Sequence, residues 1–127
     1  MVGIVLVSHS AELARGLARL VEQVAGPDVR VEPAGGDADD GLGTSGTRVE
    51  AAVERADGGD GVVVLADLGS AVLTVRHVLA ERPGGAIRLA DAPLVEGAVA
   101  AAVTAASGQP LETVLRAAEE ARGARKL

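Results

Sequence analysis

Short apolar runs alternate along the chain with segments in which apolar residues recur every three or four positions. Gly3 to Val7, Val62 to Leu65 and Ile87 to Leu89 are such runs, and Val29 to Glu32 is predicted to form another strand. Continuous apolar runs of this length are typical of strands that are buried on both faces of a sheet. The pattern therefore predicts four strands.

Five segments between and after these strands have the period of amphipathic helices. Ser10 is placed as the N-cap of the first, Thr47-x-x-Glu50 as a capping box at the start of the second, and Pro93 in the first turn of the fourth. The second is expected to end near Ala56 and the fourth near Ala106. The remaining helical positions are Leu13, Leu17, Leu20, Val21 and Val24; Val72, Val75 and Leu79; and Leu111, Val114, Leu115 and Ala118.

This alternation predicts an α/β fold, a doubly wound and mostly parallel sheet of about four to five strands with helices on both faces. Residues 1–127 are expected to form a single domain. Hydrophobic residues make up 48% of the chain and none is aromatic, so the core is expected to consist of Val, Leu, Ile and Ala. Sites in such folds lie beyond the carboxyl ends of the strands, where His9, Asp67 and the Gly- and Asp-rich loop from Pro33 to Gly46 are expected to meet.

Composition excludes several classes of function. A net charge of -6 without aromatic residues disfavours nucleic-acid binding, and the absence of cysteine rules out disulfides and thiolate metal sites. No apolar segment has the length of a membrane span or a secretion signal, so we expect no membrane association and a cytoplasmic location. P-loop and dinucleotide motifs are missing and only two histidines are present, so we predict no cofactor and no metal.

His9 is the candidate nucleophile. It follows a buried strand and opens a helix, so its ring is expected beside backbone N–H groups that favour a neutral imidazole and attract a phosphoryl group. Asp67 ends another strand, where its carboxylate would accept a hydrogen bond from one ring nitrogen and orient the ring. Two alternatives stay open: a structural role for His9, and a role of Asp67 as the cap of the helix that begins near Gly69.

Small polar residues at the same edge are candidates for phosphate binding. They are Ser10, Gly43, Thr44, Ser45, Gly69 and Ser70. Glycine permits close approach of the backbone to a phosphate, although each segment also fits an ordinary helix cap. Asp37, Asp39 and Asp40 depart from the calcium-loop spacing, and His77 lies inside a predicted helix, so none of these residues is assigned a role.

Four motifs occur together along the chain: Val7-Ser8-His9-Ser10, Gly43-Thr44-Ser45, Asp67-Leu68-Gly69-Ser70-Ala71 and Asp91-Ala92-Pro93-Leu94-Val95-Glu96-Gly97. With Ala105-Ala106-Ser107-Gly108 they resemble the phosphocarrier subunit, DhaM, of phosphotransferase-dependent dihydroxyacetone kinases. Its phospho-accepting domain is of the mannose-type IIA group. The resemblance spans nearly the whole chain, and the run from Asp91 to Gly97 favours the kinase branch over the IIA domains of mannose-type transporters.

The resemblance implies a mannose-type IIA fold, a homodimer and a phosphotransferase that belongs to a phosphoenolpyruvate–glycerone phosphotransferase system. HPr would phosphorylate His9, with Asp67 as its partner and Ser70 as a phosphate contact. The chain would then rephosphorylate ADP on the nucleotide-binding kinase subunit, and the dihydroxyacetone-binding subunit would use the ATP. Our hypothesis is that Asp67 holds the Nδ1 hydrogen while Nε2 takes the phosphoryl group.

Three alternatives remain. The first is the IIA domain of a mannose-type sugar transporter, and the second is a receiver-like regulatory domain phosphorylated on Asp67. The third is a non-catalytic dimerisation or ligand-sensing module that binds an anion. Receiver domains need an acidic cluster after the first strand and a lysine near a later one. Here Ser8 and His9 follow the first strand, and Lys126 lies in the tail.

Overall fold

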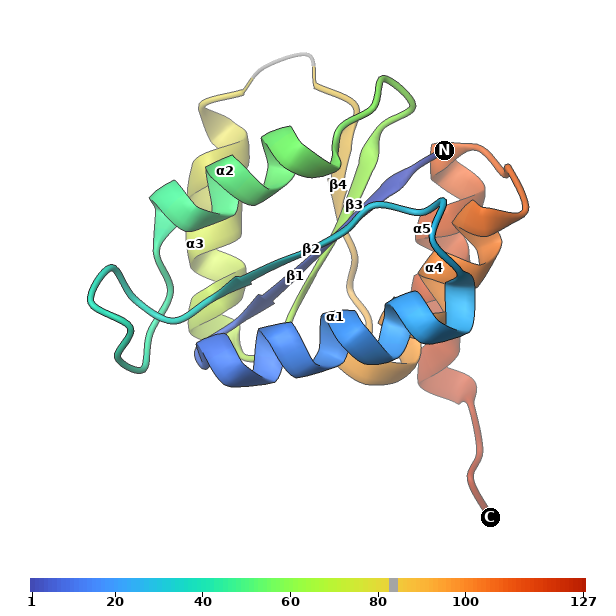
Figure 1. The fold of residues 1–127 in the computed structure, drawn as a ribbon, viewed down its shortest axis with the longest axis horizontal. Coiled ribbons are helices and arrows are strands. Elements are labelled where there is room, and N and C mark those ends of the chain that lie inside the picture. The colour runs from blue at the N-terminus through green and yellow to red at the C-terminus, as the bar shows by residue number, and fades with distance from the viewer. Residues whose placement is uncertain (83–84) are drawn as a thin grey trace.

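The computed structural model describes residues 1–82 and 85–127. It consists of a four-stranded, all-parallel sheet with helices on both sides (Figure 1). The strands are β1 (Gly3–Ser8), β2 (Val31–Gly35), β3 (Val62–Ala66) and β4 (Ile87–Leu89). Their order across the sheet is β2-β1-β3-β4. The predicted α/β class, the parallel pairing and the two-sided helical cover are confirmed.

The helices form two layers. They are α1 (Ala11–Ala25), α2 (Gly46–Ala56), α3 (Gly69–Ala80), α4 (Leu94–Ala106), α5 (Leu111–Glu120) and a final 3₁₀ turn, η1 (Ala121–Gly123). Helices α1, α4 and α5 pack on one face of the sheet, and α2 and α3 on the other (Figure 1). Within the described residues, no helix combines the length and the apolar character needed to cross a membrane.

The core divides at the central strand. Ile4 and Leu6 of β1 belong to the cluster with α1, α4 and α5, whereas Val5 and Val7 belong to the cluster with α2 and α3. Successive side chains of a strand point to opposite faces, so a continuous apolar run supplies both layers. The predicted aliphatic core of Val, Leu, Ile and Ala is confirmed.

The second strand is displaced from its predicted position. It runs from Val31 to Gly35 and not from Val29 to Glu32, which shortens the predicted loop to residues 36–45. Pro33 does not interrupt it, because β2 lies at the edge of the sheet. Since the Arg30 carbonyl and the Gly36 amide both bond to β1, the alternation of the strand turns the nitrogen of Pro33 toward the open edge, where no donor is needed.

Helix α2 begins differently from its prediction. The hydroxyl of Ser45 accepts a hydrogen bond from the amide of Arg48 at 3.3 Å, so Ser45 is the N-cap. The predicted capping box of Thr47 and Glu50 is therefore wrong, because both residues already lie inside the helix. The predicted end at Ala56 is confirmed.

Helix α4 also begins one residue later than predicted. Pro93 is its N-cap residue, with φ of -64°, and the helix starts at Leu94. Gly97 lies in the first turns of this helix and allows it to approach the sheet closely. A Cβ atom at this position would lie 2.9 Å from a methyl group of Leu65 in β3.

Candidate active site

The candidate site lies where β1 and β3 end side by side. From this point α1 leaves toward one face of the sheet and α3 toward the other, an arrangement that opens a crevice in parallel α/β folds. His9 follows β1 and Asp67 follows β3. The amide of Asp67 donates to the carbonyl of Val7 at 3.1 Å, which holds the two strand ends in register.

His9 and Asp67 are in direct contact, as their positions after neighbouring strands predicted. The Nδ1 atom of His9 lies 2.9 Å from Oδ1 of Asp67, and the amide of His9 donates to Oδ2 at 3.0 Å. The side chains are 22% and 15% exposed, so they are accessible yet partly shielded from water. The histidine backbone and ring are therefore both held by one carboxylate.

The Asp67 carboxylate accepts four hydrogen bonds. Besides the two from His9, the hydroxyl of Ser8 donates to Oδ2 at 2.8 Å and the amide of Leu68 donates to Oδ1 at 2.7 Å. Burial by itself raises the pKa of Asp67, but the hydrogen bonds from His9, Ser8 and Leu68 outweigh it and leave the pKa below its ordinary value. An ionised carboxylate only accepts hydrogen bonds, so the network places the ring hydrogen of His9 on Nδ1.

The second ring nitrogen faces the start of α3. Nε2 of His9 is hydrogen-bonded to the hydroxyl of Ser70, and with the hydrogen on Nδ1 it is Ser70 that donates. Among the described residues, no side chain caps α3: its N-cap position is held by Leu68. Amides in the first turn of a helix have no carbonyl partner within the helix, so those of Gly69 and Ser70 remain available beside Nε2. Asp67 bonds the amide of Leu68 and does not cap the helix.

The other candidates for phosphate binding make different contacts. The amide of Gly43 donates to the carbonyl of His9 at 3.0 Å, which anchors the loop of residues 36–45 but engages this amide. Thr44 lies 3.3 Å from the hydroxyl of Thr74, which also bonds the Ser70 carbonyl. The hydroxyls of Ser10 and Ser45 accept from helical amides, at 3.2 and 3.3 Å, as caps of α1 and α2. The cap role predicted for Ser10 is confirmed.

Two residues near the site were given no role from the sequence, although Ser8 lies in one of the motifs. Ser8 bonds Asp67, and Thr74 joins the loop to α3. A polar residue at the end of an otherwise apolar strand is a signal that points to Ser8. Thr74 gave no such signal, because its contact with Thr44 spans two elements that are distant in sequence.

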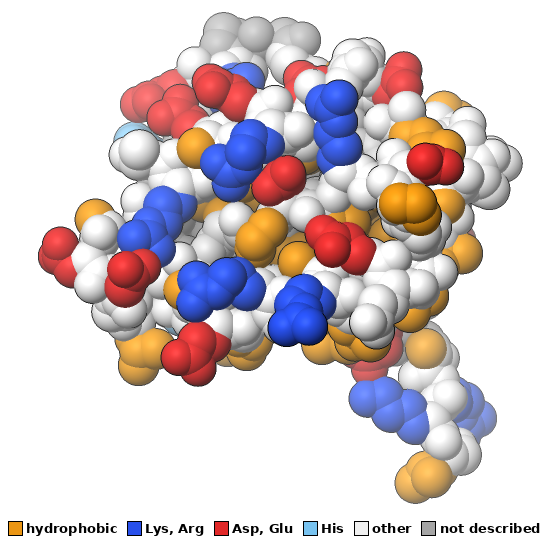
Figure 2. All heavy atoms as spheres, viewed as in Figure 1, with side chains coloured by type: hydrophobic (Ala, Val, Ile, Leu, Met, Phe, Trp, Pro, Cys, Tyr) orange, Lys and Arg blue, Asp and Glu red, His pale blue; other side chains and the backbone are white. Residues whose placement is uncertain are grey.

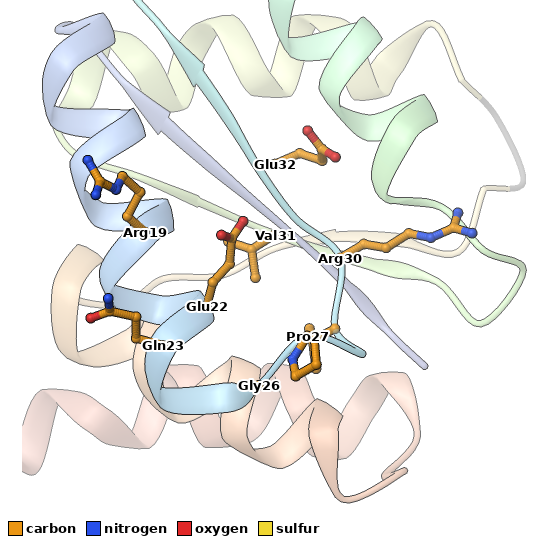
Figure 3. A pocket seen from close by; sticks show the side chains of 9 residues that line it. Arg19, Glu22, Gln23, Gly26, Pro27, Arg30, Val31 and Glu32 are labelled. Carbon is orange, nitrogen blue, oxygen red and sulfur yellow. The ribbon is translucent and has the colours of Figure 1, made fainter.

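A crevice of about 400 Å³ lies next to Asp67 between α3 and the end of β4. Val72 and Arg76 form one wall, and residues 89–92 form the other. A larger hollow of about 690 Å³ lies elsewhere, between α1 and β2, and contains none of the predicted site residues. Its side chains, among them Arg19, Glu22 and Glu32, have mixed charge (Figure 3). This side of the molecule also has basic and acidic side chains interspersed (Figure 2).

The part of the chain that the structure describes contains no group of three or more His, Asp or Glu side chains that could hold a metal ion. His77 lies on the exposed side of α3, 3.6 Å from Glu81. The site therefore consists of one histidine, one carboxylate, hydroxyl groups and helix-terminal amides. Such a set can accept and hold a phosphoryl group without a metal ligand from the chain.

The family model of the PTS system fructose IIA component, EIIA-man, matches residues 3–115. The chain belongs to the EIIA-man family. Its all-parallel sheet and two-sided helical cover agree with the mannose-type IIA fold predicted from the sequence.

Several curated relatives of this EIIA-man chain are DhaM proteins. The phosphoryl donor subunit DhaM of the PEP-dependent dihydroxyacetone kinase of Pantoea ananatis is 39% identical over 99% of this chain and 28% of the relative. The DhaM of Escherichia coli is 39% identical over 91% of the chain and 26% of the relative. The DhaM of dihydroxyacetone kinase 2 of Listeria innocua is 31% identical over 91% of the chain and 95% of the relative. The chain thus spans about a quarter of the first two relatives and nearly all of the third.

Solved structures share the fold of this EIIA-man chain. A crystal structure titled as an unknown function protein, EF1359, has a TM-score of 0.86 and 32% identity over 100% of this chain and 99% of that one. A sigma-54 interaction domain protein from Enterococcus faecalis has a TM-score of 0.68 at 16% identity, which supports the fold alone.

Proposed function

We propose that this chain carries a phosphoryl group on Nε2 of His9, taking it from HPr and passing it to ADP on the nucleotide-binding subunit of a dihydroxyacetone kinase. The observation that carries the proposal is the contact of Nδ1 with Asp67, which leaves Nε2 directed toward Ser70 and the start of α3. The DhaM names of the relatives support the kinase as the destination.

The transfer needs alignment and charge stabilisation more than covalent machinery. The lone pair of Nε2 attacks phosphorus, the P–N bond to the donor histidine breaks, and its electron pair stays on the donor nitrogen. No proton has to leave Nε2, because Asp67 keeps the ring hydrogen on Nδ1. In the second step a β-phosphate oxygen of ADP attacks phosphorus and the electron pair of the broken N–P bond returns to Nε2.

Ser70 and the amides of Gly69 and Ser70 are proposed to bind the phosphoryl oxygens. The hydroxyl that donates to Nε2 in the unphosphorylated ring turns to a phosphoryl oxygen once the P–N bond has formed. Ser10, Thr44 and Ser45 are proposed to contribute hydroxyl donors at the rim. Gly43 is the least suited of the set, because its amide already bonds the His9 carbonyl.

Exposed leucines around the site support a protein as the donor. Leu13, Leu42, Leu68 and Leu73 are 47%, 84%, 62% and 66% exposed. Each lies close in sequence to a residue that contacts His9 or Asp67, or caps α1. Exposed apolar side chains beside a site are common on surfaces that bind another protein. We propose that HPr and the nucleotide-binding kinase subunit dock on this rim in turn, in the cytoplasm.

We also propose that residues 1–127 form a single domain that assembles as a homodimer. A homodimer predicts a solution mass of twice 12.6 kDa by light scattering. A monomeric mass at all protein concentrations that support phosphoryl transfer would contradict the assembly but not the chemistry.

Labelling with ³²P-phospho-HPr tests the function. We expect acid-labile, alkali-stable label on the wild type and none on His9→Ala, with circular dichroism showing that the variant is folded. Alkali-labile label that survives His9→Ala would favour a receiver-like Asp67 phosphate, and no label at all would favour a ligand-sensing module. Transfer to a sugar-transporter domain but not to the ADP-loaded kinase subunit would favour the transporter alternative.

A further inference from the structure

Among the described residues, Ser8 is the polar residue that is buried. It is the last residue of β1, is 1% exposed, and points into the junction between the two strand ends. Its hydroxyl accepts a hydrogen bond from the amide of Ser10 at 3.0 Å and donates to Oδ2 of Asp67 at 2.8 Å. Since the Asp67 carboxylate is an acceptor only, the direction of the hydroxyl hydrogen is determined.

The bond from Ser8 completes the set of donors around Asp67. Oδ1 accepts from Nδ1 of His9 and from the amide of Leu68, and Oδ2 accepts from the amide of His9 and from Ser8. These four bonds fix the orientation of the carboxylate, and this orientation determines where Oδ1 contacts the ring. A water molecule cannot readily replace the hydroxyl of Ser8 at a position with 1% exposure.

We infer that Ser8 is a positioning residue for phosphoryl transfer, because it holds the Asp67 carboxylate in the orientation that keeps the His9 hydrogen on Nδ1 and aims Nε2 at the incoming phosphorus. Ser8 touches neither the ring nor the phosphoryl group. The inference rests on the proposed function of His9, and it adds a role to a residue whose burial alone would suggest only packing.

The structure separates Ser8 from a purely structural serine. Ser10 caps α1 through Leu13 and makes no bond to Asp67, whereas Ser8 makes no cap and bonds Asp67 directly. Loss of the Ser8 hydroxyl therefore removes a donor to Asp67 as well as the acceptor of the Ser10 amide, whereas loss of the Ser10 hydroxyl removes only the cap of α1. The two serines flank the same histidine and differ in the group that they hold.

The first test reads the ring and needs no phosphoryl donor. In Ser8→Ala, ¹⁵N NMR of His9 is expected to show a smaller fraction of the Nδ1–H tautomer than in the wild type. Ser8→Cys replaces the hydroxyl with a slightly larger thiol that is a weaker donor, so it is expected to fall between the two and serves if the alanine variant does not fold. Wild-type tautomer populations in both variants would overturn the inference, whatever the outcome of labelling.

The second test reads the reaction. Labelling of Ser8→Ala by phospho-HPr is expected to be about 10-fold slower than that of the wild type, the lower end of the loss found when a partner that orients a metal-binding histidine is removed. In an Asp67→Asn background the same substitution should have little further effect, because Ser8 acts through Asp67. An equal loss in both backgrounds would overturn the inference, whereas a wild type that takes no label would contradict the proposed function alone.

Ser107→Ala serves as the control for removing a serine hydroxyl. Ser107 ends α4, far along the chain from the strand ends, and its hydroxyl donates to the carbonyl of Thr104 at 2.7 Å. In Ser107→Ala the tautomer populations of His9 and the labelling rate are expected to equal those of the wild type. A matching change in this control would assign the effect of Ser8→Ala to general destabilisation and overturn the inference.

Discussion

Two helices begin beside His9, and their first turns are satisfied in different ways. In α1 the hydroxyl of Ser10 accepts from the amide of Leu13 at 3.2 Å, an ordinary N-cap. In α3 the N-cap position is held by Leu68, and no side chain in residues 1–82 or 85–127 caps the first turn. One amide of the first turn of α1 thus has a side-chain partner, while the first turn of α3 has none and its Ser70 hydroxyl bonds the histidine ring. We propose that α1 holds His9 in place and that the first turn of α3 binds the phosphoryl oxygens.

Asp67→Asn should have the largest effect, because Asp67 places the ring between the two helices. A side-chain amide has one acceptor oxygen and an NH₂ group, so in either orientation it sets a donor against a donor in a site that supplies four. We expect labelling by phospho-HPr to slow by on the order of 10²–10⁴-fold. The measurement is the single-turnover rate, and a wild-type rate would contradict the proposed role of Asp67.

Ser70→Ala tests the α3 side of the comparison. It removes the hydroxyl that meets Nε2 but leaves the first-turn amides in place, so we expect labelling to slow about 10-fold. The phosphohistidine should also hydrolyse faster, which ³¹P NMR follows directly. Ser10→Ala is the matched variant on the α1 side: it should lower the free energy of unfolding by about 1 kcal/mol and slow labelling less than Ser70→Ala does. The reverse order would break the comparison.

Leu68→Ser would make α3 resemble α1. A serine at the N-cap accepts from a first-turn amide, so we expect the free energy of unfolding to rise by about 0.5–1 kcal/mol. Labelling should slow at the same time, because the new cap competes with phosphoryl oxygens for the amide. Leu68→Ala is the control, since it removes the same exposed leucine without adding a cap. Equal labelling rates for the two variants would show that the first turn of α3 does not bind the phosphoryl group.

The predictable part of this fold lies in its buried strands. Continuous apolar runs such as Gly3 to Val7 specify strands buried on both faces, and the parallel order then brings His9 and Asp67 to one edge. The sequence could not place β2, because its residues pair according to register with β1, and an edge position tolerates Pro33. The local pattern also predicted Thr47 and not Ser45 as the cap of α2. Both residues precede apolar residues at helical spacing, so the pattern does not distinguish them.

The predictable part of the site is the set of residues that follow strands. Which donors surround Asp67 was not predictable, because Ser8 points inward only through the alternation of a strand whose exact end the sequence leaves open. The engagement of the Gly43 amide by His9 depends on the path of the loop of residues 36–45, which long-range contacts determine. The residue types thus predicted where the site lies. The three-dimensional contacts then separate a candidate that anchors a loop, Gly43, from the pair of side chains that contact each other, His9 and Asp67.

The smallest expected effect concerns pH and the ionised state on which the α3 side depends. Hydrogen bonds lower the pKa of Asp67 in the folded chain, so the stability that they contribute is complete above the unfolded pKa of about 3.9 and is lost as pH falls through the folded value. The difference in free energy of unfolding between the wild type and Asp67→Asn should therefore shrink below about pH 4. Urea unfolding at several pH values measures it. A difference that grows below about pH 4 would mean that the folded state favours the protonated acid, and Nδ1 would then lose the acceptor that keeps Nε2 free.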